Sequence, residues 1–140
     1  MSRFWHNWFT IWCLSVVIFG IVLTAGGLEA TSGPTQLFLE LLHGPEPVVL
    51  GALMRFSLGV CGPVSIALGL TTLAAIRAAD LLGPRGRSTW LLATAGVASW
   101  FVLDSSLSIA TGYALNVIPN TLFMGAWLLG ISRSGVLKAG

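Results

Sequence analysis

The chain has 140 residues, of which 55% are hydrophobic and 9% charged, with a formal net charge of +2 and a mean hydropathy of +0.87. Soluble domains carry about 25% charged residues on average, so this composition argues against an ordinary soluble domain and indicates a membrane protein. The seven basic residues are dispersed, which excludes a nucleic-acid-binding patch. Two cysteines cannot define a disulfide framework.

Four apolar stretches are each long enough to span a bilayer, because about 20 apolar residues cross about 30 Å of hydrocarbon. They cover approximately residues 7–28, 53–76, 88–110 and 113–131. No linker, fixed-period repeat or low-complexity tract separates them, so we expect residues 1–140 to form a single transmembrane domain. The sequence therefore predicts an all-α fold, an integral membrane bundle of four transmembrane helices.

The basic residues beside the spans predict the orientation. Six of the seven fall on one side of the membrane if both termini are cytoplasmic: Arg3, Arg77, Arg85, Arg87, Arg133 and Lys138. The loop between the first two spans carries Glu29, Glu40 and Glu46, and no base follows until Arg55. Lys and Arg accumulate in cytoplasmic loops, so we expect both termini in the cytoplasm.

The same outer loop contains "TSGPTQLFLELLHGPEP", residues 31–47. Ser32 could cap a helix here, Pro34 suits its first turn, and Gly44 can end it. The apolar face of this helix would hold Leu37, Phe38, Leu41 and Leu42, opposite Gln36, Glu40 and His43. We therefore predict a short amphipathic helix that lies on the outer membrane surface or covers the bundle.

Three residues of this loop are the only candidate metal ligands. Glu40 and His43 have the Glu-x-x-His spacing that di-iron bundles use in pairs, and Glu46 follows three residues later. Here the motif occurs once, at a helix end, which is typical of a solvated polar face. We therefore assign no metal to the chain.

An unusual density of polar side chains lies in "WFVLDSSLSIATGYALNVIPN", residues 100–120. Gly96, Trp100, Asp104 and Ser108 share one helical face, and small or polar residues on one face favour contact with other helices. Asp104 lies about 24 Å along the third span, measured from Ser88 at about 1.5 Å per residue. We therefore expect its carboxylate to face the bundle in the outer leaflet.

Other polar residues are predicted to reach the same depth. Arg55 opens the second span, and Asn116 and Asn120 open the fourth. The predicted outer-leaflet polar cluster consists of Arg55, Asp104, Ser108, Asn116 and Asn120. Two interpretations stay open. The cluster pins the helices through an Asp–Arg pair, with Asn116 as a helix cap, or Asp104 binds a cation, a proton or a ligand headgroup.

Trp5, Trp8 and Trp12 lie along one side of the first span at its cytoplasmic end. This pattern predicts an interfacial aromatic belt at the headgroup level. The alternative is that these rings pack a pigment, haem or quinone beside His6, but that imidazole lies at the edge of the membrane, where water would reach it. We therefore leave the cofactor unassigned.

The segments "RFSLGVCGPVSIALGLT" and "WFVLDSSLSIATGYALNVIPNTLF" together resemble a group of small four-helix bacterial integral membrane proteins of uncharacterised function, over about half of the chain. In that group a glycine-rich second helix follows an acidic outer loop, and Trp-Phe-Val-x-Asp-Ser leads to Gly and two Asn. The matching positions are Gly59, Gly62, Gly69, Trp100, Phe101, Asp104, Ser105, Gly112, Asn116 and Asn120. The resemblance implies a bacterial inner (cytoplasmic) membrane and no particular activity.

The sequence contains no nucleophile–base pair, phosphate-binding loop or nucleotide motif, which favours a protein that is not an enzyme. Our leading interpretation is a non-catalytic accessory or stabilising subunit of a larger membrane complex. The alternative is a carrier that binds a small ligand, lipid or ion at the polar cluster. A third is a membrane enzyme on a lipid-like substrate, with Asp104, Glu40 and His43 as candidates. The expected partners are the lipid bilayer and either a larger complex or further copies of the chain.

Overall fold

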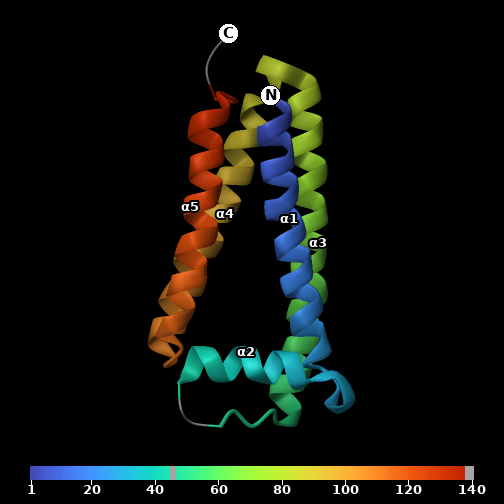
Figure 1. Cartoon of the computed structure of the whole chain (residues 1–140), viewed down its shortest axis with the longest axis vertical. Coiled ribbons are helices and arrows are strands. Elements are labelled where there is room, and N and C mark those ends of the chain that lie inside the picture. Colours follow the sequence, from blue (N-terminus) through green and yellow to red (C-terminus); the bar gives the residue numbers. More distant parts are fainter. Residues whose placement is uncertain (45–46, 138–140) are drawn as a thin grey trace.

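The computed structural model describes residues 1–44 and 47–137, and every regular element within these ranges is helical (Figure 1). In chain order the elements are α1 (Arg3–Ala25), η1 (Glu29–Thr31), α2 (Gly33–His43), α3 (Ala52–Leu82), η2 (Gly83–Gly86), α4 (Arg87–Ala110), η3 (Ala114–Asn116) and α5 (Val117–Ser134). Four helices, α1, α3, α4 and α5, run along the molecule, and α2 crosses them at one end. We call this end the α2 end, and the opposite end, which carries the N-terminus and η2, the basic end.

Three segments of the described chain are long and apolar enough to cross a membrane: Arg3–Ala25, Ala52–Ala110 and Ala114–Ser134. The second contains both α3 and α4, which run in opposite directions on either side of η2 (Figure 1). The predicted all-helical class is therefore confirmed.

Several helix boundaries differ from the predicted spans. α1 begins at Arg3 instead of near residue 7, and α3 continues to Leu82 instead of ending near residue 76. A one-turn 3-10 helix, η3, precedes α5, which begins at Val117. The predicted spans followed the apolar stretches alone, whereas helical hydrogen bonding continues through polar residues such as Arg77 and Asp80 beyond an apolar segment.

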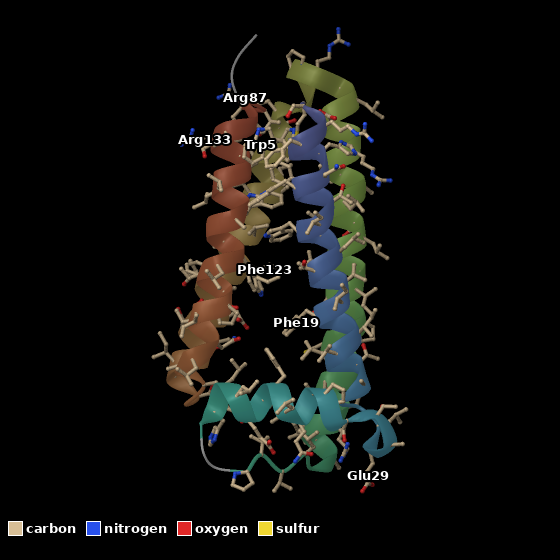
Figure 2. All side chains as sticks on the ribbon, in the orientation of Figure 1. Trp5, Phe19, Glu29, Arg87, Phe123 and Arg133 are labelled. Atoms are coloured by element: carbon tan, nitrogen blue, oxygen red, sulfur yellow. The ribbon has the colours of Figure 1, made fainter. Side chains whose placement is uncertain are left out.

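Most arginines gather at one end of the molecule, where Asp80 of α3 also lies and pairs with the N-terminal ammonium at 3.0 Å. The arginines at the basic end are Arg3, Arg77, Arg85, Arg87 and Arg133, from α1, α3, η2, α4 and α5. Figure 2 shows Arg87 and Arg133 at this end and Glu29 at the other. Among the described residues, Arg55 is the one arginine at the α2 end, four residues into α3.

Glycines determine the contact between α1 and α3, the most extensive between any two helices of the molecule. A Cβ added to Gly20 would lie 2.7 Å from the carbonyl oxygen of Gly62, and one added to Gly62 would lie 2.6 Å from that of Gly20. One heptad further along each helix, a Cβ on Gly69 would lie 2.8 Å from the Cys13 carbonyl. The two backbones therefore touch, as small residues allow in membrane helices.

Aromatic rings fill the bundle near the basic end. They come from α1, α4 and α5: Phe9, Trp12, Trp90, Phe123 and Trp127. The Phe9 ring centroid lies 5.0 Å from that of Trp90 and 5.3 Å from that of Trp127, which in turn lies 4.9 Å from Trp12. These separations are within the range of favourable aromatic pairs. The cluster therefore joins α1 to α4 and α5.

α2 connects the two sides of the bundle at the α2 end (Figure 1). On one side the buried Thr35 hydroxyl donates to the Val22 carbonyl of α1, and the Phe38 ring lies 5.4 Å from that of Phe19. On the other side the His43 ring lies 4.9 Å from that of Tyr113, between α4 and η3. α2 therefore bridges α1 and the α4–α5 connection.

Two details of α2 correct the sequence prediction. Ser32 precedes α2 but does not cap it with its side chain, because its hydroxyl donates to the Glu29 carbonyl at 3.0 Å. The predicted apolar face is also divided, because Phe38 packs inward against α1 whereas Leu37 and Leu41 are 59% and 67% exposed. α2 thus presents apolar side chains both to the bundle and to its surroundings.

The close approach of α1 and α3 predicts that a Gly→Ala substitution at their contact lowers the stability of the protein, the opposite of its usual effect in a helix. Gly→Ala in a helix normally stabilises by about 0.5–1 kcal/mol, but Gly62→Ala should destabilise by about 1–3 kcal/mol because its Cβ would overlap the backbone of α1. Gly96→Ala is the matched control, since no atom of the described residues outside its own helix backbone lies within 4 Å of its added Cβ. Thermal unfolding in detergent, followed by tryptophan fluorescence, measures both. Equal behaviour of the two variants would contradict this packing.

Candidate functional site

One face of α5 carries Asn120, Phe123, Trp127 and Gly130, and Asn116, the residue just before the helix, extends this face. Spacings of three and four residues place side chains on the same helical face. Asn120, Trp127 and Gly130 are buried, and the other two are partly buried. The face is therefore aromatic toward the basic end and polar toward the α2 end.

The aromatic half of this face packs directly against α1. The indole N–H groups of Trp8 and Trp12 donate to backbone carbonyls of α5, those of Ala126 at 3.0 Å and Phe123 at 2.9 Å. A Cβ on Gly130 would lie 2.7 Å from the Phe9 ring, so no larger residue fits there without displacing that ring. These contacts hold α1 and α5 together at the basic end.

The predicted aromatic belt therefore needs correction. Trp12 is only 8% exposed and Trp8 is partly buried, and both turn toward α5 rather than toward lipid. Trp5 is partly exposed and packs edge-on against Trp8, with ring centroids 5.8 Å apart. The periodicity places all three on one helix face, but α5 covers Trp8 and Trp12, and its carbonyls accept the indole protons of these two rings.

The polar half of the face binds a carboxylate of α4. The Asn116 amide nitrogen donates to Asp104 Oδ2 and to Ser108 Oγ, both at 2.9 Å. The Asn120 amide nitrogen also donates to Asp104 Oδ2, and to Ser105 Oγ at 3.2 Å. A primary amide has two N–H donors, so these four bonds use every amide proton of the pair. We call these five residues the Asp104 site.

The unused hydrogen-bonding capacity of the Asp104 site consists mainly of acceptors. Within residues 1–44 and 47–137, no donor reaches Asp104 Oδ1 and no basic side chain forms an ion pair with this carboxylate. The carbonyl oxygens of Asn116 and Asn120 likewise accept no side-chain bond there. Asp104 and Asn116 are partly exposed. The site therefore combines a formal negative charge with free, accessible acceptors.

The structure brings together four of the five predicted cluster residues and leaves out Arg55. Its Nη1 donates to the Gly26 carbonyl at 3.4 Å, at the C-terminal end of α1. The last carbonyls of a helix lack helical donors and attract cations, and the glycine contact brings the first turn of α3 to them. Arg55 therefore supports the end of α1 and does not neutralise Asp104.

Asn116 also differs from its predicted role. It occupies the position before α5 but makes no side-chain capping bond. An N-cap side chain accepts from the second or third residue of the helix, and the third residue here is Pro119, which has no N–H. The amide instead turns to the carboxylate and hydroxyl of α4.

The candidate metal ligands of the outer loop do not converge in the described chain. Glu40 accepts a hydrogen bond from Gln36 at 3.1 Å, and His43 packs against Tyr113. Glu46 lies outside the described residues. Within the described ranges no group of three or more His, Cys, Asp or Glu side chains is placed to hold a metal ion.

Sequence reasoning missed Ser105 and the aromatic half of the α5 face. Ser105 is buried and accepts from Asn120, although it lies outside the i, i+4 stripe of Asp104. The signal was present in α5, where Asn116, Asn120, Phe123 and Trp127 form one heptad-like series.

The chain was also compared with known proteins. No protein-family model, curated protein or solved structure matches it.

The shared carboxylate predicts that Asp104 and Asn120 are energetically coupled. In a double-mutant cycle of Asp104→Ala and Asn120→Ala, the coupling free energy should be about 0.5–3 kcal/mol. The control cycle pairs Asp104→Ala with Thr121→Ala, whose exposed hydroxyl bonds to its own helix, and should be additive within about 0.5 kcal/mol. Unfolding free energies in detergent measure both cycles. Additivity of the first cycle would contradict the bonding described.

Proposed function

We propose that this chain is a four-span integral membrane protein of a bacterial inner membrane, with both termini in the cytoplasm. At about 1.5 Å per residue, α1, α3 and α4 are each long enough to cross about 30 Å of hydrocarbon, and η3 extends α5. The arginines gathered at the basic end support a cytoplasmic position for it. α2 then lies at the outer surface, where its exposed leucines meet the headgroup region.

A cysteine-labelling experiment tests this orientation. With Cys13→Ala and Cys61→Ala as background, Glu29→Cys and Arg85→Cys place single thiols at the α2 end and the basic end. A membrane-impermeant maleimide should label the first variant in intact cells and the second only after permeabilisation. Labelling of both thiols from the same side would refute the four-span arrangement, and the reverse pattern would refute the orientation.

We infer further that the function of the protein is to bind a cation, or the cationic group of a small ligand, at the Asp104 site. The observation that carries this proposal is a carboxylate held by two amides, with free acceptors and no basic partner in the described chain. Ionisable groups inside a membrane are costly and mark binding sites or relays by default. A bound cation would supply the charge that Arg55 does not.

Removing the charge of Asp104 tests the binding proposal. Intrinsic tryptophan fluorescence, to which Trp100 contributes one turn from Asp104, follows titration of the protein in lipid nanodiscs with sodium, potassium or methylammonium at constant ionic strength. We expect saturable binding of at least one cation and a loss of about tenfold or more in affinity in Asp104→Asn, since a charge-assisted contact contributes about 1.5–3 kcal/mol. Glu29→Gln, which removes an exposed carboxylate, should bind as the wild type does. Unchanged binding in Asp104→Asn, or no saturable binding, would overturn the proposal.

A second candidate function, an accessory subunit of a larger membrane complex, is favoured by the outer surface of α4. Ala95, Gly96 and Ser99 are exposed there, beside a shallow concavity lined by Ala98, Ser99, Val102 and Leu103. Small residues allow another helix to approach closely. An enzyme is less well supported, because neither Glu40 nor His43 bonds to Asp104 within the described chain.

A further inference from the structure

The register between α1 and α5 places an aromatic residue opposite the Asp104 site. Trp8 and Trp12 bond to successive turns of α5 in antiparallel order, with Trp12 at the level of Phe123. One heptad beyond Trp12 along α1 is Phe19, and one heptad before Phe123 is Asn116. Both lie about 10 Å nearer the α2 end, at about 1.5 Å per residue. Phe19 therefore lies at the depth of Asn116.

At this depth α1 no longer packs on α5. The glycine contact holds α1 against α3, and Figure 1 shows the α1–α3 pair and the α4–α5 pair diverging toward the α2 end. Figure 2 shows Phe19 and Phe123 directed into the region between the pairs. Phe19 remains 37% exposed there, and Asp104 and Asn116 are also partly exposed. Phe19 on one pair and Asp104 and Asn116 on the other are therefore each accessible at this depth.

α2 joins the two helix pairs at this end of the molecule (Figure 1). Its Phe38 ring lies 5.4 Å from the Phe19 ring, and its His43 ring lies 4.9 Å from the Tyr113 ring. We call the Asp104 site, on α4 and α5, the polar side, and the paired rings of Phe19 and Phe38, on α1 and α2, the aromatic side.

These two sides differ in what they can bind. The polar side offers a carboxylate oxygen and amide carbonyl oxygens, which match the N–H donors of an ammonium group. The aromatic side can bury an apolar group and also attracts cations through the ring faces. A hydrated inorganic cation would use only the first side, whereas an ammonium that carries an apolar substituent would use both.

We propose that the Asp104 site takes an organic ammonium ion, whose N–H groups donate to Asp104 and Asn116 and whose apolar substituent packs against Phe19. This inference rests on the proposed binding of cations at Asp104 and names the class of ligand. It requires that affinity depend on the apolar group as well as on the charge.

The test compares two ammonium ions that differ in their apolar part. Methylammonium and 2-phenylethylammonium are titrated into the protein in phosphatidylcholine nanodiscs, whose choline groups have no N–H donors, and partition into empty nanodiscs is subtracted. We expect 2-phenylethylammonium to bind about tenfold or more tightly, because its ring is buried. Phe19→Ala should remove most of this ratio, and Phe19→Leu, which retains apolar volume, should remove less. Phe56→Ala is the matched control, since that ring is 69% exposed on α3, and should keep the wild-type ratio.

The outcomes separate this inference from the proposal on which it rests. Equal affinities of the two ions, or a ratio that survives Phe19→Ala, would overturn the aromatic contact while leaving cation binding at Asp104 intact. Absence of binding by both ions, or binding unaffected by Asp104→Asn, would overturn both proposals. Replacing part of the lipid by phosphatidylethanolamine identifies the source of the ammonium. Competition by this lipid would support the chemistry with a headgroup as the ligand, and its absence would support a free amine.

Discussion

The backbone contact between α1 and α3 constrains the rest of the structure. Gly20, Gly62 and Gly69 leave no room for side chains between the two helices, so α1 follows α3 toward the α2 end. At the basic end, aromatic packing also holds α1 against α4 and α5. Because the α4–α5 pair diverges from α3 toward the α2 end, α1 cannot stay in contact with both over its whole length. The face of α5 therefore loses α1 as a neighbour where its residues change from Phe123 to Asn120 and Asn116.

This loss of a neighbour explains the composition of the Asp104 site. An unpaired polar group is costly in an apolar environment. The polar side chains of this part of α5 have no contact with α1, so they form hydrogen bonds with neighbouring residues of the bundle. Asn116 and Asn120 do so by donating every amide proton to α4. The negative charge of Asp104 stays without a basic partner in the described chain, because Arg55 binds the end of α1. The same geometry that separates Arg55 from Asp104 underlies the proposed binding of an external cation.

The sequence allowed prediction of the features that depend on local pattern. The apolar stretches predicted the long helices, Pro34 and Gly44 predicted α2, and the polar residues of the third and fourth spans predicted which side chains meet. Arg55 was misplaced because its partner depends on the register of α1 against α3, which glycines set through backbone contact and which no side-chain pattern reveals. The sequence places Trp8 and Trp12 at the headgroup level because periodicity identifies a helix face but not the neighbour that covers it.

The most direct measurement of the central claim is covalent labelling of Asp104 by a hydrophobic carbodiimide, followed by mass spectrometry of the intact protein and its peptides. Such reagents react with carboxyl groups that are reached from an apolar phase. If the α1–α3 contact leaves the Asp104 site open and free of a basic partner, Asp104 should be modified, and methylammonium should protect it. An unmodified Asp104, or a modification that methylammonium does not slow, would contradict the account.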